Sequence, residues 1–370
     1  MRPMSWIKKL AFLAIIWAVA LVVLLAGTEI LLRLTDDGWG STVRLNIIRN
    51  RTYQFDVSKL YDNDPPTISY HRNQYGLRDD CASPAAIDIL TVGGSTTDQR
   101  YVAQEATFQS VMERDLSRLA GRKICVSNAG VDGHSTYGHE LAFRYWFPLI
   151  PNLKPKLFVF FIGVNDADFT RQGPSDFDAK RPAGFKGAVK QLRVVQLGYW
   201  AAETFRSLTR RQPDYAGHVR ENKQLALYTD TQIAADTPER AARNAQGFRI
   251  RLRRLLDDAH SGGAEALCVT QPDRMARMVG GRQRGLPKGF GWDGSKFKYG
   301  GLDYDYSLRL LNQVMLEECG KDRLVDLYDA PFDDGDFYDY VHATPSGSRK
   351  EGTAIARFVA GSDLMRAWRK

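Results

Sequence analysis

From residue 87 onward, short continuous apolar runs alternate with longer segments whose apolar positions recur every three or four residues. Continuous apolar runs are typical of strands that are buried on both faces, and the longer segments are typical of helices that cover them. The predicted strands are 87–92, 123–130, 156–163, 265–272 and 323–328, and the predicted helices are 107–121, 139–150, 244–263, 306–320 and 348–368. This alternation predicts an α/β three-layer sandwich with a five-stranded, mostly parallel sheet.

A much longer apolar run lies near the N-terminus. No charged residue occurs from residue 10 to 27, and the stretch reaches Leu32 if Glu29 is included. About 20 helical residues cross a hydrocarbon core, and the basic residues before the run (Arg2, Lys8 and Lys9) favour a cytoplasmic N-terminus. A cleaved signal peptide is the alternative, but its apolar region would be shorter. We therefore expect an uncleaved transmembrane helix that leaves the rest of the chain outside the cytoplasm.

These patterns divide the chain into three regions. Residues 1–33 form a cytoplasmic basic tip and membrane anchor, 34–86 an N-terminal arm with short strands, and 87–370 the α/β domain. Two basic insertions interrupt this domain: 171–220 has ten Lys/Arg against four Asp/Glu, and 274–300 has seven against one.

The formal charge of the chain is +8, which favours anionic partners such as a membrane surface or an acidic glycan. Nucleic acid is not an expected partner of a domain outside the cytoplasm.

The four cysteines bear on the compartment. Cys81, Cys125, Cys268 and Cys319 could form two bridges in three pairings in an oxidising compartment. Cys125 and Cys268 lie inside apolar runs, so buried free thiols are the alternative. The six histidines do not cluster with cysteines at ligand spacings, so we expect neither a metal nor another cofactor.

Candidate chemistry follows four of the predicted strands. The first is followed by Gly-Gly-Ser-Thr (93–96), the second by the glycine loop 127–133, the third by "GVND" (163–166) and the fifth by "DFYDYVH" (336–342). In open α/β sheets, ligands bind outside the carboxyl ends of the strands. A serine, a glycine loop, an asparagine and an Asp-x-x-His pair are therefore predicted at one edge of the sheet.

These segments resemble, in type and order, the four blocks of the SGNH (GDSL-type) hydrolase superfamily. "VGGSTT" resembles the serine block, "NAGVDG" the glycine block, "LKPKLFVFFIGVND" the asparagine block and "DYVH" the histidine block, and the resemblance covers about residues 87–360. It implies the flavodoxin-like SGNH fold and a serine acyl hydrolase of a membrane-anchored, cell-envelope branch. The commonest serine block of the family is Gly-Asp-Ser, whereas this chain has Gly-Gly-Ser, which suggests a divergent branch rather than a lipase-like one.

The chemistry of acyl transfer agrees with this resemblance. A serine hydroxyl needs a base to take its proton, and His342, oriented by Asp339, can serve Ser95 in that way. Their spacing of three predicts that both side chains lie on one side of a helical turn. The resemblance assigns the oxyanion hole to the backbone N–H groups of Ser95 and Gly133 and to the amide of Asn165. His134 and His139 are rival bases that lie on the oxyanion side of the site.

The anchor and the basic insertions indicate the substrate class. We expect a bacterial inner-membrane protein whose periplasmic domain is an esterase or an O-acyltransferase for acetyl esters of a cell-envelope polysaccharide, as in similar superfamily members with one N-terminal membrane segment. Arg274 and Trp292, which lie in a basic and aromatic loop, are the candidate substrate contacts. A transferase would need a multi-span membrane acyltransferase as partner, because one helix cannot carry acetyl groups across a bilayer.

Two other functions stay open. Residues 186–211 could form a basic amphipathic helix on the bilayer, which would favour a lipid-directed esterase or thioesterase. A non-catalytic, glycan-binding component of a polysaccharide assembly complex is the third interpretation. The sequence leaves open the acyl group, the glycan, and the choice between hydrolysis and transfer.

Overall fold

The centre of the molecule is a parallel sheet of five strands. The computed structural model describes residues 6–34, 42, 45–169, 189, 192–195, 197–198, 228–230, 232–288 and 299–366. The strands of the sheet are β3 (Ile89–Gly93), β4 (Val126–Asn128), β5 (Leu157–Phe161), β6 (Glu265–Val269) and β9 (Leu324–Val325). Their order is β4-β3-β5-β6-β9, and every neighbouring pair is parallel. This is the flavodoxin-like order, and it confirms the predicted fold class.

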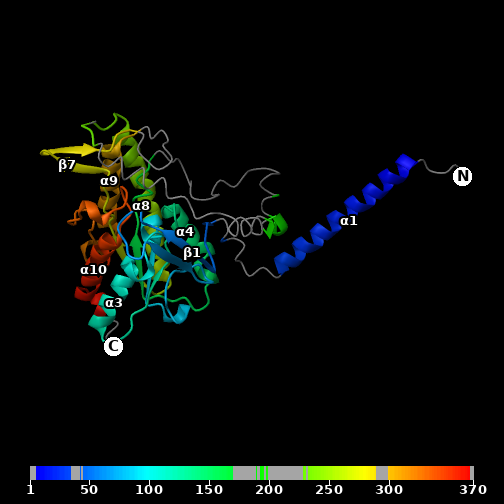
Figure 1. Cartoon of the computed structure of the whole chain (residues 1–370), viewed down its shortest axis with the longest axis horizontal. Helices are drawn as coiled ribbons and strands as arrows, with labels where there is room; N and C mark the ends of the chain where they lie inside the picture. The colour runs from blue at the N-terminus through cyan, green and yellow to red at the C-terminus, as the bar shows by residue number, and fades with distance from the viewer. Residues whose placement is uncertain are drawn as a thin grey trace.

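Helices cover both faces of the sheet (Figure 1). Side chains alternate in direction along β5: Phe158 and Phe160 join one core cluster, whereas Leu157, Val159 and Phe161 join the other. The first cluster lies under α4 (Thr136–Tyr145), α8 (Thr237–Ser261) and α9 (Gly301–Cys319). The second lies under α3 (Phe108–Ala120), α10 (Pro345–Gly361) and α11 (Asp363–Arg366). Burial on both faces explains why the strands are mainly apolar.

Local signals fix the ends of these helices. The hydroxyl of Thr107 accepts a hydrogen bond from the N–H of Ser110 at the start of α3, and Gly121, with φ +66°, ends it in the left-handed region. α10 begins with the Thr344 cap followed by Pro345. The described chain also contains five short 3₁₀ helices: η2 (Pro84–Ala86), η3 (Gln104–Ala106), η4 (Phe147–Leu149), η5 (Lys321–Arg323) and η6 (Asp334–Asp336).

The described part of the arm contains an antiparallel hairpin. β1 (Arg51–Asp56) pairs with β2 (Thr67–Arg72), with Phe55 opposite Ile68. Its apolar side chains form a third core cluster with two tyrosines of the α/β domain; the members are Phe55, Val57, Leu60, Ile68, Tyr70, Tyr101 and Tyr338. The arm therefore packs on the domain rather than standing apart from it.

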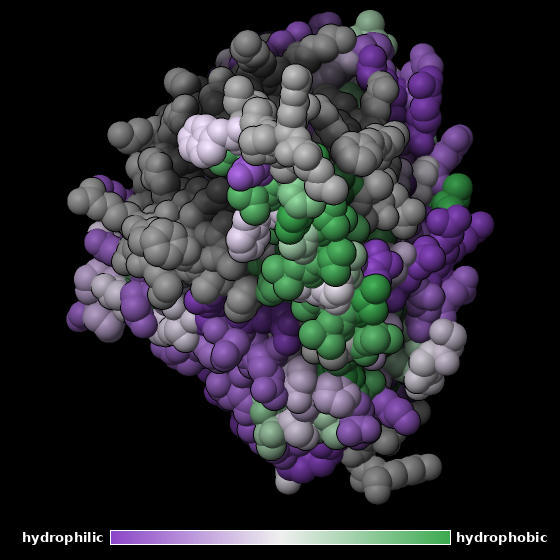
Figure 2. Space-filling model, turned by 90° about the vertical axis from the view of Figure 1, so that its right-hand side faces the viewer, coloured by the Kyte–Doolittle hydropathy of each residue, from purple (hydrophilic) through white to green (hydrophobic). Residues whose placement is uncertain are grey.

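The N-terminal apolar run is a single helix, α1 (Trp6–Leu34), which extends away from the body (Figure 1). Within it, Lys9–Leu34 is long and apolar enough to cross a membrane, and a signal sequence would have the same properties. Most of the exposed large apolar residues among those described belong to this helix. Figure 2, which views the molecule from the side of α1, shows apolar residues gathered over the helix, with hydrophilic residues below and to the right of them.

The two basic insertions are described only in part. Most of 171–220 and all of 289–298 lie outside the described residues. The described part of the second insertion forms the hairpin of β7 (Ala276–Val279) and β8 (Arg282–Gly285).

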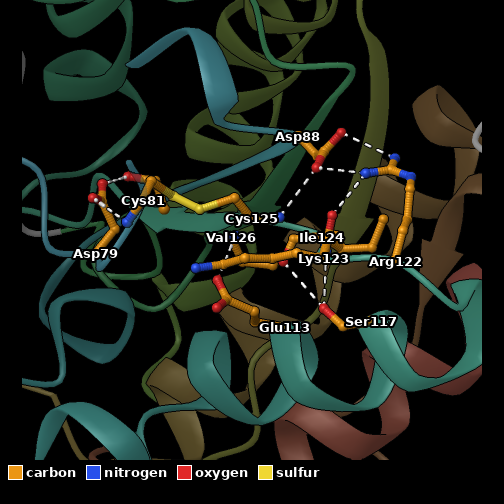
Figure 3. Close-up of a disulfide and its surroundings, with 11 residues drawn as sticks. Asp79, Cys81, Asp88, Glu113, Ser117, Arg122, Lys123, Ile124, Cys125 and Val126 are labelled. Atoms are coloured by element: carbon orange, nitrogen blue, oxygen red, sulfur yellow. Dashed lines mark hydrogen bonds and ion pairs between the residues drawn. A yellow bond between two sulfur atoms is a disulfide. The ribbon is translucent and has the colours of Figure 1, made fainter. Parts of the chain in front are cut away.

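All four cysteines are paired, which decides between the alternatives that the sequence left open. Cys81 is bonded to Cys125, and Cys268 to Cys319. The first bridge joins the end of the arm to the residue before β4, beside Asp79 and Asp88 (Figure 3). The second joins β6 to the last residue of α9. Cys125 and Cys268, which lie in apolar runs of the sequence, are therefore not free thiols.

Candidate active site

The nucleophile candidate lies at the carboxyl end of a central strand. β3 ends at Gly93, and Ser95 begins the four-residue helix α2 (Ser95–Asp98). A Cβ on Gly93 would lie 2.0 Å from Thr97 Oγ1 and 2.3 Å from the carbonyl oxygen of Phe161. A Cβ on Gly94 would lie 2.4 Å from Asn165 Nδ2. The close approach of these groups explains both glycines, and it gives a physical reason why an aspartate does not precede the serine here.

A continuous hydrogen-bonded chain links the three predicted triad residues. Ser95 Oγ lies 2.8 Å from His342 Nε2, and His342 Nδ1 lies 2.6 Å from Asp339 Oδ2. Because a carboxylate can only accept, Nδ1 carries the hydrogen and Nε2 is left to accept from the hydroxyl. Asp339 is fully buried, and its other oxygen accepts from the N–H groups of Val341 at 2.9 Å and His342 at 2.7 Å.

The Asp-x-x-His segment is not helical, so the predicted helical turn is wrong. Residues 338–341 are bends in a loop that an antiparallel bridge between Phe337 and Ala343 closes. The N–H of Tyr338 donates to the carbonyl oxygen of His342 at 3.0 Å. The carboxylate folds back onto the two N–H groups that follow it, and this tight loop brings both side chains to the same side.

The glycine and asparagine loops meet on the other side of Ser95. Asn165 Nδ2 donates to the carbonyl oxygen of His134 at 2.8 Å, which leaves its second N–H for another acceptor. Gly133, the residue before His134, has φ +79°, a value that favours glycine. Asn165 also approaches Gly94 closely, as described above, so the structure brings Asn165 beside the serine turn and the glycine loop.

Sequence comparison agrees with this geometry. Residues 91–350 match the model of the GDSL-like Lipase/Acylhydrolase family. The chain belongs to this family. Membership makes it an SGNH-type serine hydrolase. No curated protein matches the chain significantly.

Several solved structures of esterases and acylhydrolases are similar to this chain. One is the lipase/acylhydrolase from Enterococcus faecalis, at 16% identity, with 74% of this chain and 96% of the other covered and a TM-score of 0.39. Another is the acetylxylan esterase Axe2 from Geobacillus stearothermophilus, at 13% identity, with 73% and 93% covered and a TM-score of 0.39. A third is the acetyl xylan esterase AlAXEase, at 14% identity, with 73% and 98% covered and a TM-score of 0.37. Such distant likeness carries no argument about substrate.

The rival histidines His134 and His139 are both buried in this GDSL-like chain. His134 Nε2 lies 2.9 Å from the carbonyl oxygen of Leu45, in the arm. His139 is buried, and this burial, followed by the neighbouring His134, lowers the pKa of its imidazole well below the ordinary value. The histidine that contacts the serine hydroxyl is His342.

Of the two residues predicted to contact the substrate, the structure describes Arg274 but not Trp292. Arg274 lies beside the histidine loop, where its backbone N–H donates to the carbonyl oxygen of Tyr340 at 2.7 Å. Its guanidinium forms an ion pair with Asp334 at 2.8 Å. Trp292 lies outside the described residues. Contact of either residue with substrate stays a prediction.

One buried residue at this edge is absent from the predicted set. Gln271 follows β6, and its amide contacts residues next to both Ser95 and Asn165. The end of this strand carries none of the residue types of the four family blocks. The strand-end rule that selected the other positions would nevertheless have found it.

One group of side chains in the described part of the chain has the residue types of a metal site, but its cysteines cannot act as ligands. Ligand-type atoms of Cys81, Glu113 and Cys125 lie within 4.8 Å of one another. The two sulfur atoms are bonded to each other, so neither can bind a metal as a thiolate.

Proposed function

We propose that this chain is a membrane-anchored serine esterase or O-acyltransferase that acts on acetyl esters of a cell-envelope glycan. The observation that carries the proposal is the chain of hydrogen bonds from buried Asp339 through His342 to Ser95. Three such groups at the carboxyl edge of a parallel sheet can activate a hydroxyl for attack on an ester.

In the proposed reaction, Ser95 Oγ attacks the carbonyl carbon of the ester while His342 Nε2 takes the hydroxyl proton. The bond to the leaving alcohol then breaks, and this alcohol, a sugar hydroxyl, receives the proton from His342. Asp339 stabilises the intervening imidazolium. Water, or the hydroxyl of an acceptor, completes the cycle by attacking the acetyl-serine with the same histidine as base.

Three N–H groups would hold the negative oxygen of the tetrahedral intermediate. They are the backbone N–H groups of Ser95 and Gly133 and the second N–H of the Asn165 amide. The hydrogen bond from Asn165 to the carbonyl oxygen of His134 supports this role, because it fixes the amide in place. Each such donor typically contributes about 3 kcal/mol in the transition state.

Three features support a periplasmic site of action and an anionic or membrane-associated substrate. The helix α1 can span a bilayer, and the basic residues before its apolar run favour a cytoplasmic N-terminus. The two disulfides suit an oxidising compartment. The net charge of +8 suits an acidic polymer. A transferase role additionally requires a multi-span partner that supplies acetyl groups.

The test uses the full-length chain in detergent. It should release acetate from p-nitrophenyl acetate and react with a fluorophosphonate at Ser95, and Ser95→Ala should abolish both. Turnover that persists in Ser95→Ala would remove Ser95 as nucleophile. A wild-type protein that neither turns over nor reacts would favour the non-catalytic alternative. Rates that rise steeply from acetyl to octanoyl esters would favour a lipid substrate.

A further inference from the structure

We infer that the arm, through its residues 45–86, is a positioning element of the active site that holds Ser95 from one side and His342 from the other. This inference rests on the proposed function. It goes beyond it because the four blocks of the family begin after the arm, so none of them includes these residues. The contacts follow two separate routes, one ionic and one aromatic.

The ionic route begins at Arg72, at the end of β2. Its guanidinium is 3% exposed and forms an ion pair with Asp98, the last residue of the helix that Ser95 begins. The same guanidinium donates to the carbonyl oxygens of Asn128 at 2.9 Å and Gly130 at 2.6 Å, in the glycine loop. One side chain of the arm thus joins the serine helix to the loop that carries Gly133.

Asp98 is charged in this setting despite its burial. Burial alone would raise the pKa of its carboxyl, but the positive charges of Arg72, Arg100 and Arg78 hold this pKa below the ordinary value. The hydroxyl of Tyr70, also in β2, donates to the same carboxylate at 2.8 Å. A buried ion pair is stable only when its geometry is complete, so the arm and the serine helix restrict each other to one arrangement.

Arg78 strengthens the same route at the same, carboxyl end of α2. Its guanidinium, fully buried, donates to the carbonyl oxygens of Asp98 at 2.9 Å, Gln99 at 2.8 Å and Val102 at 2.6 Å. A positive charge at the carboxyl end of a helix is stabilising. The backbone of Arg78 also pairs with Asn128, and three residues later the Cys81–Cys125 bridge fastens the arm covalently (Figure 3).

The aromatic route leads to His342. The ring of Tyr338 stacks on the imidazole with an interplanar angle of 6° and a centroid distance of 5.5 Å. Tyr61 of the arm lies 6.2 Å from Tyr338, centroid to centroid, and its hydroxyl donates to the carbonyl oxygen of Tyr101. Phe55 of the arm meets Tyr101 edge-to-face at 5.1 Å, and Tyr101 meets Tyr338 at 6.3 Å. The imidazole is thus held by the Asp339 carboxylate and by a ring that the arm supports.

These contacts matter because attack requires the serine hydroxyl and the imidazole to keep their mutual distance and direction. Displacement by about 1 Å can cost a hundredfold in rate. Arg72 acts on the serine helix through Asp98, and Tyr61 acts on His342 through Tyr338, so their effect is on position. Loss of either contact should lower kcat and the reactivity of Ser95 while leaving KM nearly unchanged.

The experiment compares Arg72→Met with Arg72→Lys, and Tyr61→Leu with Tyr61→Phe, in the full-length chain in detergent. Arg72→Met should lower kcat and the rate of fluorophosphonate labelling by roughly tenfold or more, with KM within about twofold. Arg72→Lys should recover part of the loss because it keeps a positive charge beside the carboxylate of Asp98. Tyr61→Phe should be nearer to wild type than Tyr61→Leu because it keeps the ring against Tyr338.

Leu116→Ala is the matched control for stability. This residue is buried in the cluster between α3 and α10 and does not touch the arm, so the variant should be less stable yet keep kcat at temperatures where it is folded. Folded Arg72→Met and Tyr61→Leu proteins with kcat within about twofold of wild type would overturn the inference. If Arg72→Met does not fold, the Tyr61 pair decides. An inactive, unlabelled wild type would instead remove the proposed function itself.

Discussion

The side-chain amide of Gln271 donates a hydrogen bond to Thr96 Oγ1 at 2.5 Å, and its oxygen accepts the backbone N–H of Val164 at 2.6 Å. Thr96 follows Ser95 and Val164 precedes Asn165 in the chain. One buried amide at the end of β6 therefore fixes the separation of the candidate nucleophile from a candidate oxyanion donor.

Replacing Gln271 should harm both stability and turnover. Gln271→Met keeps the length of the side chain but leaves the Thr96 hydroxyl and the Val164 N–H without this partner, so the free energy of unfolding should fall by roughly 2–4 kcal/mol. Urea denaturation measures this loss, and kcat should fall with it. Gln271→Glu is the matched variant for the donor half of the amide: it keeps the acceptor for Val164 but sets a buried carboxylate oxygen against the carbonyl oxygen of Phe161, so it should also lose stability. Equal stability of Gln271→Met and wild type would contradict the role of Gln271 in holding Thr96 and Val164 in place.

Gly94→Ala should inactivate the enzyme with little effect on its secondary structure. The added methyl group would meet Asn165 Nδ2 at 2.4 Å and the carbonyl oxygen of His134 at 2.9 Å, so it must push Asn165 aside. Loss of one oxyanion donor lowers kcat by roughly 10²–10³-fold. Gly361→Ala, at the end of α10 where no atom lies within 4 Å of the added methyl, is the control and should leave kcat unchanged. Full activity of Gly94→Ala would show that Asn165 need not occupy its present place.

Glu351 should make the protein less stable as the pH rises. Its burial in α10, followed by the charge of Asp336, raises the pKa of its carboxyl to about 8 from the ordinary 4.5. Between these two pH values the folded chain holds a proton that the unfolded chain has released, so this group lowers the free energy of unfolding by roughly 1 kcal/mol per pH unit. Its stabilising contribution is complete below pH 4.5 and is lost as the pH rises through 8.

Glu351→Gln mimics the protonated carboxyl and removes that dependence. The variant should gain stability relative to wild type steadily from pH 5 to pH 8, as thermal unfolding at several pH values would measure. Glu105→Gln removes the same charge at an exposed position and should show no such trend. A difference between Glu351→Gln and wild type that does not vary with pH would rule out titration of this group in the folded protein.

The two disulfides should differ in their effect on catalysis. The bridges span 44 and 51 residues, so in the chain-entropy account either double Cys→Ser replacement should lower the free energy of unfolding by roughly 4 kcal/mol. Removal of the Cys81–Cys125 bridge should also lower kcat, because it loosens the arm. Removal of the Cys268–Cys319 bridge should leave kcat closer to wild type. The reverse order of effects on kcat would argue against the arm as a support.

The sheet could be predicted from sequence because burial on both faces leaves an unbroken apolar signal. The strand 157–161 illustrates this, since each of its residues is buried. The predicted strands are nevertheless too long. The strand β4 ends at Asn128, although the prediction extends to residue 130, and β6 ends at Val269, although the prediction extends to residue 272. At both places the chain turns at the sheet edge into the loops of the site. Similarly, β9 keeps only two residues of its predicted six.

The three side chains of the proposed triad could be selected from sequence because each follows a strand, and the structure joins them by hydrogen bonds. Their catalytic roles and the oxyanion donors stay predictions. The contacts by which the arm holds the serine helix and His342 could not be predicted from the sequence. Arg72 and Asp98 are charged residues separated by 26 positions, and hydropathy places such residues at the surface. Only the folded chain shows that each is buried because the other neutralises it.

The Cys81–Cys125 bond has an analytical consequence. Trypsin cleaves after Arg78 and Arg100, and after Lys123 and Arg144, so one peptide, 79–100, contains both Cys81 and Ser95. Without a reducing agent it leaves the digest joined to peptide 124–144, which contains Gly133. A fluorophosphonate adduct on that joined pair, detected by mass spectrometry, would show in one measurement that the Cys81–Cys125 bond is intact and that the nucleophile lies in one of these two peptides.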